Sequence, residues 1–208
     1  MYSALAFAFA ALAAATPAPQ KGSSPEDPLR VTATALEAGS QGDGQSINAD
    51  LGSFYIGGRP TGTLSPPAGD TNEYATKNTI FTYVNSQGGL GLSVAVPGGQ
   101  QVYVDSGDEA NGYLAGGLKY TEAETNKTLG GVPLFEGFVN YYDGIMKFEG
   151  QDWIACPVDF KGQVLAVWAA SRISPNKDRN GCVDFQFKIH EPVDGPQLAW
   201  AYKFNPGP

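Results

Sequence analysis

The sequence has few of the residues on which catalysis and metal binding most often depend. Its 208 residues include only two cysteines, Cys156 and Cys182, and one histidine, His190. A zinc site takes several Cys or His ligands, and a nucleophilic thiol or hydroxyl needs a base beside it. We therefore expect neither a metal nor a cofactor.

Charge and long hydrophobic runs are also scarce. Charged residues make up 16% of the chain and the formal net charge is −8. Because no cluster of Lys and Arg stands out, we expect no nucleic-acid partner. An acidic surface is repelled by anionic lipid, and no stretch reaches the roughly 20 apolar residues that span a bilayer. We therefore expect no membrane partner.

The N-terminal residues carry a targeting signal. Residues 1–15, MYSALAFAFAALAAA, are apolar and contain no charged side chain. Ala13 and Ala15 form the small-x-small pattern that signal peptidase reads, which predicts cleavage after Ala15 and a secreted protein. Residues 16–28, TPAPQKGSSPEDP, predict a flexible leader. The rest divides into a domain at 29–193 and a C-terminal extension at 194–208.

Composition and periodicity favour an all-β fold. Aromatics reach 12% and there are 27 glycines, which suits strands separated by many turns. Several runs alternate apolar and polar residues, as strands with one buried face do. The expected strands are Arg30–Leu36, Ser53–Ile56, Thr79–Val84, Leu90–Val96, Gln101–Val104, Gly112–Ala115, Gly137–Asn140, Ile145–Phe148, Asp152–Ala155, Gln163–Ala169, Val183–His190 and Leu198–Phe204. Trp153 and Trp168 lie inside such runs and are expected in the core, while residues 121–128 are expected to form a loop.

Two segments resemble each other within the chain. Residues 83–92, YVNSQGGLGL, and residues 138–148, FVNYYDGIMKF, both place an aromatic-Val-Asn run before a glycine-containing turn and a strand. Asp143-Gly144 and Gly88-Gly89 are hairpin dipeptides. A four-stranded unit repeated at this spacing predicts a single compact domain with a β-trefoil-like barrel. A β-sandwich is the alternative.

Secretion favours a disulfide between the two cysteines. They lie 26 positions apart, and closing that loop stabilises a fold by about 3.5 kcal/mol in the chain-entropy account. A buried unpaired thiol and a reactive thiol are the alternatives. His190, the one available imidazole, lies far along the sequence at a strand end.

Hydrolase chemistry has weak support. A glycosidase needs two carboxylates that face each other across a sugar, and most candidates stand in turns, where Asp is favoured for backbone reasons. No Gly-x-Ser-x-Gly elbow accompanies His190. Residues 105–112 are rich in oxygen ligands but lack the spacing of a calcium loop. The candidate carboxylates are Asp105, Asp108, Glu109, Glu136, Asp143, Glu149, Asp152 and Asp159.

Two surface features point to carbohydrate. Tyr141 and Tyr142 adjoin the Asp143-Gly144 turn, where aromatic rings could stack on the apolar face of a sugar. Asn126-Lys127-Thr128 is an Asn-x-Thr sequon in a polar segment, which predicts N-glycosylation at Asn126.

Three segments also resemble a known family: MKFEGQDWIACP (146–157), GQVLAVWAA (162–170) and SPNKDRNGCVDFQF (174–187). They are similar to the fungal phialide and conidium cell-wall proteins of the PhiA type, some of which are IgE-binding allergens. Weaker similarity covers most of residues 45–190. The family pattern falls on Gly150, Asp152, Ile154, Ala155, Cys156, Pro157, Trp168, Asn180 and Cys182.

The resemblance implies a secreted cell-wall protein linked to asexual sporulation and wall integrity, without assigned catalytic residues. We therefore expect a monomeric, non-enzymatic wall protein whose partners are wall polysaccharide or other wall proteins. One alternative is a lectin-like module that binds carbohydrate through Tyr141 and Tyr142. A second is a small secreted glycan hydrolase.

Overall fold

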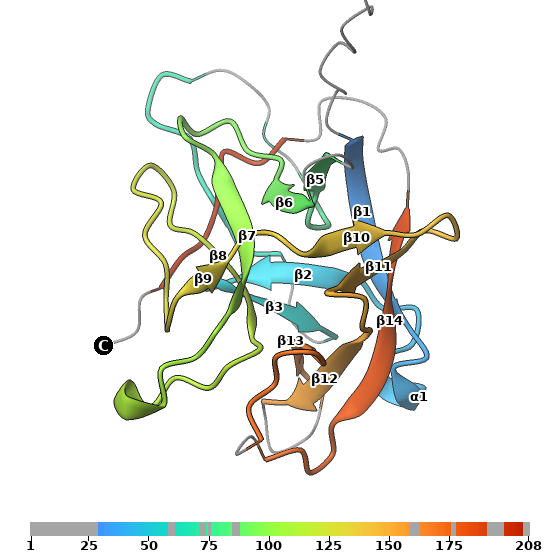
Figure 1. Ribbon diagram of the computed structural model, residues 1–208. Coiled ribbons are helices and arrows are strands. Elements are labelled where there is room, and N and C mark those ends of the chain that lie inside the picture. The colour runs from blue at the N-terminus through green and yellow to red at the C-terminus, as the bar shows by residue number, and fades with distance from the viewer. Residues whose placement is uncertain are drawn as a thin grey trace, which may run out of the picture.

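The computed structural model describes residues 29–57, 61–70, 74, 76–84, 88–158, 163–175, 178–190 and 198–205 (Figure 1). The predicted signal peptide and leader lie outside these residues. Over the described residues the chain is almost entirely strand and turn, which confirms the all-β prediction. None of the helices found there is long and apolar enough to cross a membrane.

In the described part of the chain, helix is confined to two short turns, α1 (Gly39–Gly42) and a 3₁₀ turn at Glu109–Asn111. The strands are β1 (Leu29–Leu36), β2 (Ile47–Asp50), β3 (Ser53–Ile56), β4 (Thr63–Leu64), β5 (Phe81–Val84), β6 (Gly89–Leu92), β7 (Gln100–Asp105), β8 (Leu118–Tyr120), β9 (Pro133–Leu134), β10 (Phe138–Asn140), β11 (Ile145–Phe148), β12 (Trp153–Pro157), β13 (Leu165–Ala169), β14 (Val183–His190) and β15 (Ala201–Tyr202).

The strands join in one large sheet and one small one. The large sheet has 13 strands, with the main order β1-β5-β6-β7-β8-β3-β13-β12-β14-β11-β10, while β2 adds to β3 and β9 adds to β7. β1 also pairs with β14, so the line of pairings returns to its first strand. β4 and β15 form a separate pair. The pairings give a single sheet-rich domain, and the choice between trefoil and sandwich stays a prediction.

The two similar segments of the sequence both form hairpins. β5 pairs with β6 and β10 pairs with β11, each antiparallel, as the hairpin dipeptides predict. The hairpins are also fastened to each other. The Tyr83 hydroxyl donates to the Phe138 carbonyl (3.4 Å) and accepts from the Asn140 amide (3.1 Å). The β10–β11 hairpin therefore stands on a fixed base.

An aromatic cluster around Trp153 forms part of the core. Alternate side chains of β14 are buried, because a strand turns successive residues to opposite faces. Trp153 is fully buried, and its ring contacts those of Phe138, Phe148 and Phe187. Its indole nitrogen donates to the Met146 carbonyl at 2.7 Å, which satisfies the polar atom of this core residue. The prediction that Trp153 is a core residue is confirmed.

Trp168 does not share that position. In β13 the inward side chains are Leu165, Val167 and Ala169, so the alternation turns Trp168 to the outer face, where it is half-buried. It packs there over Gly117. The prediction that Trp168 is fully in the core is wrong. All residues of this run are apolar, so the sequence does not show that alternate side chains face opposite sides of the strand.

The strand expected at Gly112–Ala115 is also wrong. Gly112 ends the 3₁₀ turn in the left-handed conformation, at φ 78°. The chain then turns again before β8 begins at Leu118. Glycines flank this short run on both sides, so residues 112–115 form a connecting loop and not a strand. By contrast, residues 121–128 form the expected loop.

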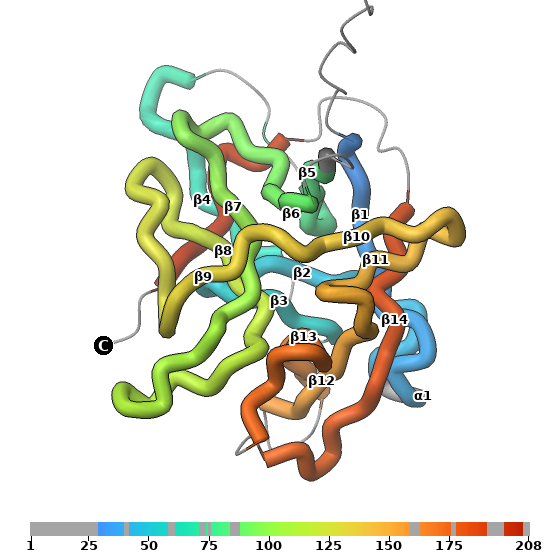
Figure 2. Tube along the Cα trace, in the orientation of Figure 1, coloured from blue at the N-terminus to red at the C-terminus, as the bar shows by residue number. Residues whose placement is uncertain are grey.

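The C-terminal tail is part of the core. Ala199, Ala201 and Tyr202 are buried, and Figure 2 shows this last segment beside β4. The buried Gln100 amide accepts from the Tyr202 amide (2.7 Å) and donates to the Tyr202 carbonyl (3.1 Å). The Tyr202 hydroxyl accepts from the Ile80 amide at 2.9 Å. The extension expected at 194–208 therefore contains core residues of the domain.

Candidate functional site

The turn between β10 and β11 carries the two predicted sugar-stacking tyrosines. Gly144 adopts φ 74° and donates from its amide to the Tyr141 carbonyl at 2.8 Å. The Asp143 carboxylate accepts from the Ile145 amide at 3.0 Å, which closes the turn. Figure 1 shows this turn at the edge of the molecule, beyond β14. Residues 138–148 are called the tyrosine hairpin below.

The tyrosine hairpin exposes apolar surface to solvent. Tyr142 is fully exposed, while Tyr141 and Val139 are 43% and 42% exposed. The Lys147 ammonium lies 5.7 Å from the centre of the Tyr141 ring, a cation–π contact that holds this ring in place. The neighbouring ring of Tyr142 is exposed to solvent. The turn therefore presents one aromatic ring that a cation–π contact holds in place and one that is fully exposed.

The hairpin borders a shallow depression of about 580 Å³. Its lining residues are Val139, Asn140, Tyr141, Tyr142, Asp143, Gly144 and Ile189. The Asn140 side-chain oxygen is buried and has no hydrogen-bond partner among the described residues. A ligand hydroxyl could supply the missing donor, because a buried acceptor gains stability when it is paired.

Contacts to β14 hold the tyrosine hairpin in position. The Ile189 amide donates to the Gly144 carbonyl at 2.9 Å, and the Lys188 ammonium donates to the Asp143 carbonyl. A surface that is already ordered loses less conformational entropy when a ligand binds. The arrangement can therefore present aromatic rings to a flat apolar surface such as the face of a sugar.

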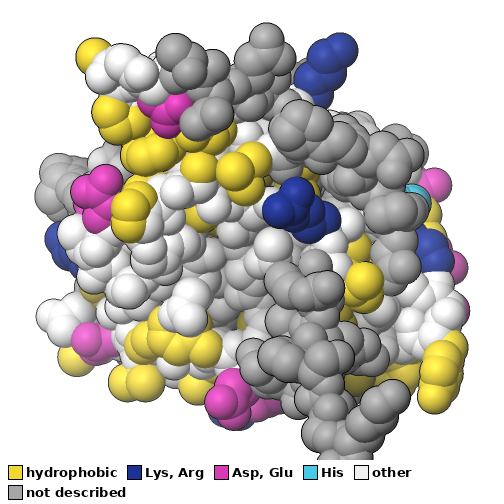
Figure 3. Space-filling view, turned by 90° about the horizontal axis from the view of Figure 1, so that it is seen from above, with side chains coloured by type: hydrophobic (Ala, Val, Ile, Leu, Met, Phe, Trp, Pro, Cys, Tyr) yellow, Lys and Arg dark blue, Asp and Glu magenta, His cyan; other side chains and the backbone are white. Residues whose placement is uncertain are grey.

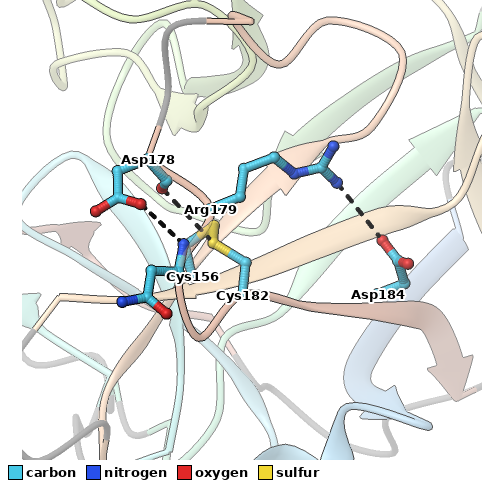
Figure 4. Close-up of a disulfide and its surroundings, with 6 residues drawn as sticks. Cys156, Asp178, Arg179, Cys182 and Asp184 are labelled. Atoms are coloured by element: carbon cyan, nitrogen blue, oxygen red, sulfur yellow. Dashed lines mark hydrogen bonds and ion pairs between the residues drawn. A yellow bond between two sulfur atoms is a disulfide. The ribbon is translucent and has the colours of Figure 1, made fainter.

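The two cysteines form a disulfide, shown in Figure 4. Cys156 lies buried in β12, and Cys182 stands just before β14. The loop that leads to Cys182 is ordered by the Asn180 amide, which donates to the Asp178 carboxylate at 2.9 Å. The alternatives of an unpaired thiol and a reactive thiol are wrong, and this bond joins a core strand to a later loop.

Asp105 is the most buried of the candidate carboxylates. It has no exposed surface and lies 2.5 Å from the Lys119 ammonium. The same carboxylate accepts from the amides of Gly107 and Gly131, each at 2.8 Å. A Cβ at Gly130 would lie 1.8 Å from this carboxylate, so only glycine fits there. Asp105 therefore fastens two loops together.

Most other candidate carboxylates also have partners within the fold. Glu149 pairs with Arg172, Asp152 with Lys147 and Glu109 with Ser174. Asp108 caps the 3₁₀ turn. Asp159 lies outside the described residues.

The last of the candidate residues is His190. His190 lies 2.8 Å from the Thr34 hydroxyl, on the strand pair β1–β14. Within the parts of the chain that the structure describes, no group of three His, Cys, Asp or Glu could hold a metal ion. On the face seen in Figure 3, the described Lys and Arg side chains lie apart from one another.

Asn126 of the sequon lies exposed in the loop after β8. Its backbone is left-handed, at φ 54°, a conformation that Asn tolerates better than most residues. The Tyr103 hydroxyl binds both the amide and the carbonyl of Leu129 and so anchors the end of this loop. Burial raises the pKa of Tyr103 to about 12.

The sequence did not reveal every residue of the depression. Val139 and Asn140 could have been found from the strand pattern before the Asp143-Gly144 turn. Ile189 could not, because it arrives from β14, which pairs with β11 across a long stretch of sequence.

Together these features define a class of protein: an all-β domain with one disulfide and an exposed aromatic hairpin. Residues 31–203 match the family of PhiA-like secreted proteins. Because the match spans most of the chain, the protein belongs to this family and is a secreted fungal protein. No curated protein and no solved structure matches the chain.

Proposed function

We propose that this protein is a non-enzymatic component of the fungal cell wall, with a role in conidium development and wall integrity. One observation carries the proposal: most of the described side chains that could perform chemistry are engaged in contacts within the fold. Both cysteines are in the disulfide, and Asp105 is buried against Lys119. Membership of a secreted family supports an extracellular site of action.

Fractionation of a producing fungus tests the wall assignment. We expect the protein in the washed wall fraction, from which hot detergent or digestion with glucanase or chitinase releases it. Recovery of all the protein from the culture medium would overturn the assignment. Purified protein should release no reducing sugar from chitin or β-glucan, and release that Glu136→Gln abolishes would favour the hydrolase alternative.

The tyrosine hairpin favours a second candidate function, binding of wall polysaccharide. The supporting observation is the fully exposed ring of Tyr142 beside the braced ring of Tyr141 and the unpartnered oxygen of Asn140. Stacked aromatic rings contribute about 0.5–1.5 kcal/mol beyond the area they bury. Loss of one ring should therefore weaken binding by up to about tenfold.

Retention on isolated fungal wall, chitin and β-glucan tests this candidate. We expect Tyr141→Ala and Tyr142→Ala each to lower retention. Tyr113→Ala is the matched control, since Tyr113 is 41% exposed and also has a lysine ammonium, that of Lys119, 5.6 Å from its ring centre. Equal retention of all three variants and the parent would overturn the hairpin as a binding site.

The proposal also includes a monomer, an N-linked glycan at Asn126 and a trefoil-like arrangement of the strands. IgE binding, which the resemblance implies, belongs to it as well. The exposure of Asn126 supports the glycan. Light scattering of the purified protein at several concentrations tests the monomer.

A further inference from the structure

The outer face of β6 carries no side chains. This strand reads Gly89-Leu90-Gly91-Leu92, and both leucines are buried in the core. Because side chains alternate along a strand, both glycines face outward. The outer surface of β6 is therefore bare backbone between β5 and β7.

No described residue outside its two chain neighbours requires glycine at position 89. Its φ lies outside the left-handed region, and the atom nearest to an added Cβ would be the Phe135 carbonyl oxygen at 4.0 Å. Gly91 is more restricted, because a Cβ there would lie 2.7 Å from the Thr82 hydroxyl. Glycine inside a strand lowers stability and often marks a place where a ligand or another backbone comes close. The described residues leave the space beside Gly89 open, and this openness points to a binding role.

Side chains of the neighbouring strands form two walls along this bare strip. Thr82 on β5 and Gln101 on β7 both pair with Gly91, so they stand two strand spacings apart, about 10 Å. Phe135 and Glu136 complete the lining beside them, in the segment that runs from β9 to β10 (Figure 2). The Phe135 ring packs against Tyr103, with 5.6 Å between the ring centres. The resulting depression, called the glycine trough, has a volume of about 540 Å³.

The lining of the glycine trough limits what it could bind. No Lys or Arg is among its described lining residues, which disfavours phosphate groups and nucleic acid. A peptide could not add to the sheet here, because β6 already pairs with a strand on both sides and strand addition needs an open edge. The lining instead combines a hydroxyl, an amide, a carboxylate and one aromatic ring.

That combination suits a carbohydrate chain. The polar groups can exchange hydrogen bonds with sugar hydroxyls, while the Phe135 ring and the bare backbone can contact the apolar faces of the sugar rings. A β-1,4 linkage gives an extended ribbon that can lie along a straight strand, whereas an α-1,4 linkage makes the chain coil. We propose that the glycine trough binds an extended chain of β-1,4-linked hexopyranose rings. Like the second candidate function, this proposal involves contact with wall polysaccharide. It concerns a different site, the glycine trough in place of the tyrosine hairpin.

Titration of the isotope-labelled protein with chitohexaose, followed by NMR, tests the proposal. We expect shifts of the backbone amides at 89–91, 101 and 135–136, and no such shifts with maltohexaose, an α-1,4-linked control. Gly89→Val should fill the trough and weaken chitohexaose binding at least tenfold, without lowering the melting temperature. Thr32→Val, which places the same residue on the half-buried outer face of β1, should leave affinity unchanged.

Gln101→Ala is a second variant that does not depend on the packing of β6, since Gln101 is exposed. It should weaken chitohexaose binding severalfold. Amide shifts confined to 139–144 would support the tyrosine hairpin and overturn the trough. Shifts confined to the trough would support it and count against the hairpin. Unchanged affinity in both Gly89→Val and Gln101→Ala, or no shift at all with chitohexaose, would overturn the trough, while the retention of the tyrosine variants still tests the hairpin separately.

Discussion

Removal of the disulfide offers the sharpest test of what stabilises this domain. The bond joins residues 26 apart in sequence. Closing a loop of that size removes about 12 cal/mol/K from the entropy of the unfolded chain, which corresponds to about 3.5 kcal/mol at 25 °C. Since β12 already pairs with both β13 and β14 through backbone hydrogen bonds, the folded state should keep its shape without the bond. The double variant Cys156→Ala/Cys182→Ala should therefore fold, with a free energy of unfolding lower by about 3.5 kcal/mol.

Urea denaturation followed by tryptophan fluorescence measures this difference, because Trp153 is buried and becomes exposed on unfolding. With a slope of about 2 kcal/mol per molar urea, the midpoint should fall by roughly 1.7 M. The parent protein in a reducing agent is the control, since it keeps both sulfur atoms and loses only the bond. Its urea midpoint should lie close to that of the double variant. The packing of the Cys156 sulfur accounts for the remaining difference. A loss below about 1 kcal/mol in both would refute the chain-entropy account for this domain.

Three further predictions concern charge, burial and modification. Arg172 lowers the pKa of Glu149, so this exposed pair adds stability above the normal carboxyl pKa that is lost as the pH falls through the lowered one. Arg172→Gln should lower the free energy of unfolding by about 0.2–1 kcal/mol at pH 7, and this difference should shrink as the pH falls. Burial raises the pKa of Tyr103 to about 12 against an ordinary value of 10.0, so its contribution to stability is intact below pH 10 and declines as the pH rises from there toward 12. Absorbance of phenolate at 295 nm should show this tyrosine ionising only above pH 10, and Tyr103→Phe should reduce the alkaline loss. In a fungal host, Asn126→Gln should remove one glycan, seen as a lower mass of the secreted protein.

Each of these has a defined contrary result. A difference between parent and Arg172→Gln that does not shrink as the pH falls would show that the arginine acts through packing and not through charge. An unchanged alkaline profile in Tyr103→Phe would place the alkaline loss on other tyrosines. Equal masses of the parent and Asn126→Gln would mean that the sequon is not used. Thr128→Ala is the matched control there, because it removes the sequon and keeps the asparagine.

The sequence predicted much of the local structure because alternation and turn residues act over short distances. β3, β11 and β14 have the expected bounds, and Asp143-Gly144 forms the expected turn. β2 was missed because Ile47 and Ala49 are its inward residues, and Asn48 and Asp50 between them are poor strand formers. The pairing partners were beyond prediction. β3 lies between β8 and β13, and no local pattern encodes contacts over such sequence separations.

The candidate site was predictable in the same partial way. Tyr141 and Tyr142 were found because they adjoin a recognisable turn. The Asn140 side-chain oxygen is buried without a described hydrogen-bond partner because of the packing around it, which only the three-dimensional structure reveals. The glycine trough was overlooked because glycines in a β-rich sequence are expected in turns. Its position on a central strand follows only from the pairing of β6 with β5 and β7.

The buried tail has a consequence for when this domain can fold. Tyr202 supplies partners to the amide of Gln100 and to the backbone of Ile80, so these buried polar groups stay unsatisfied until residue 202 arrives. An unsatisfied buried polar group costs about 1–3 kcal/mol. The ribosome makes residues 199–204 after every other part of the described core. The last step of folding therefore waits for this segment to leave the ribosome.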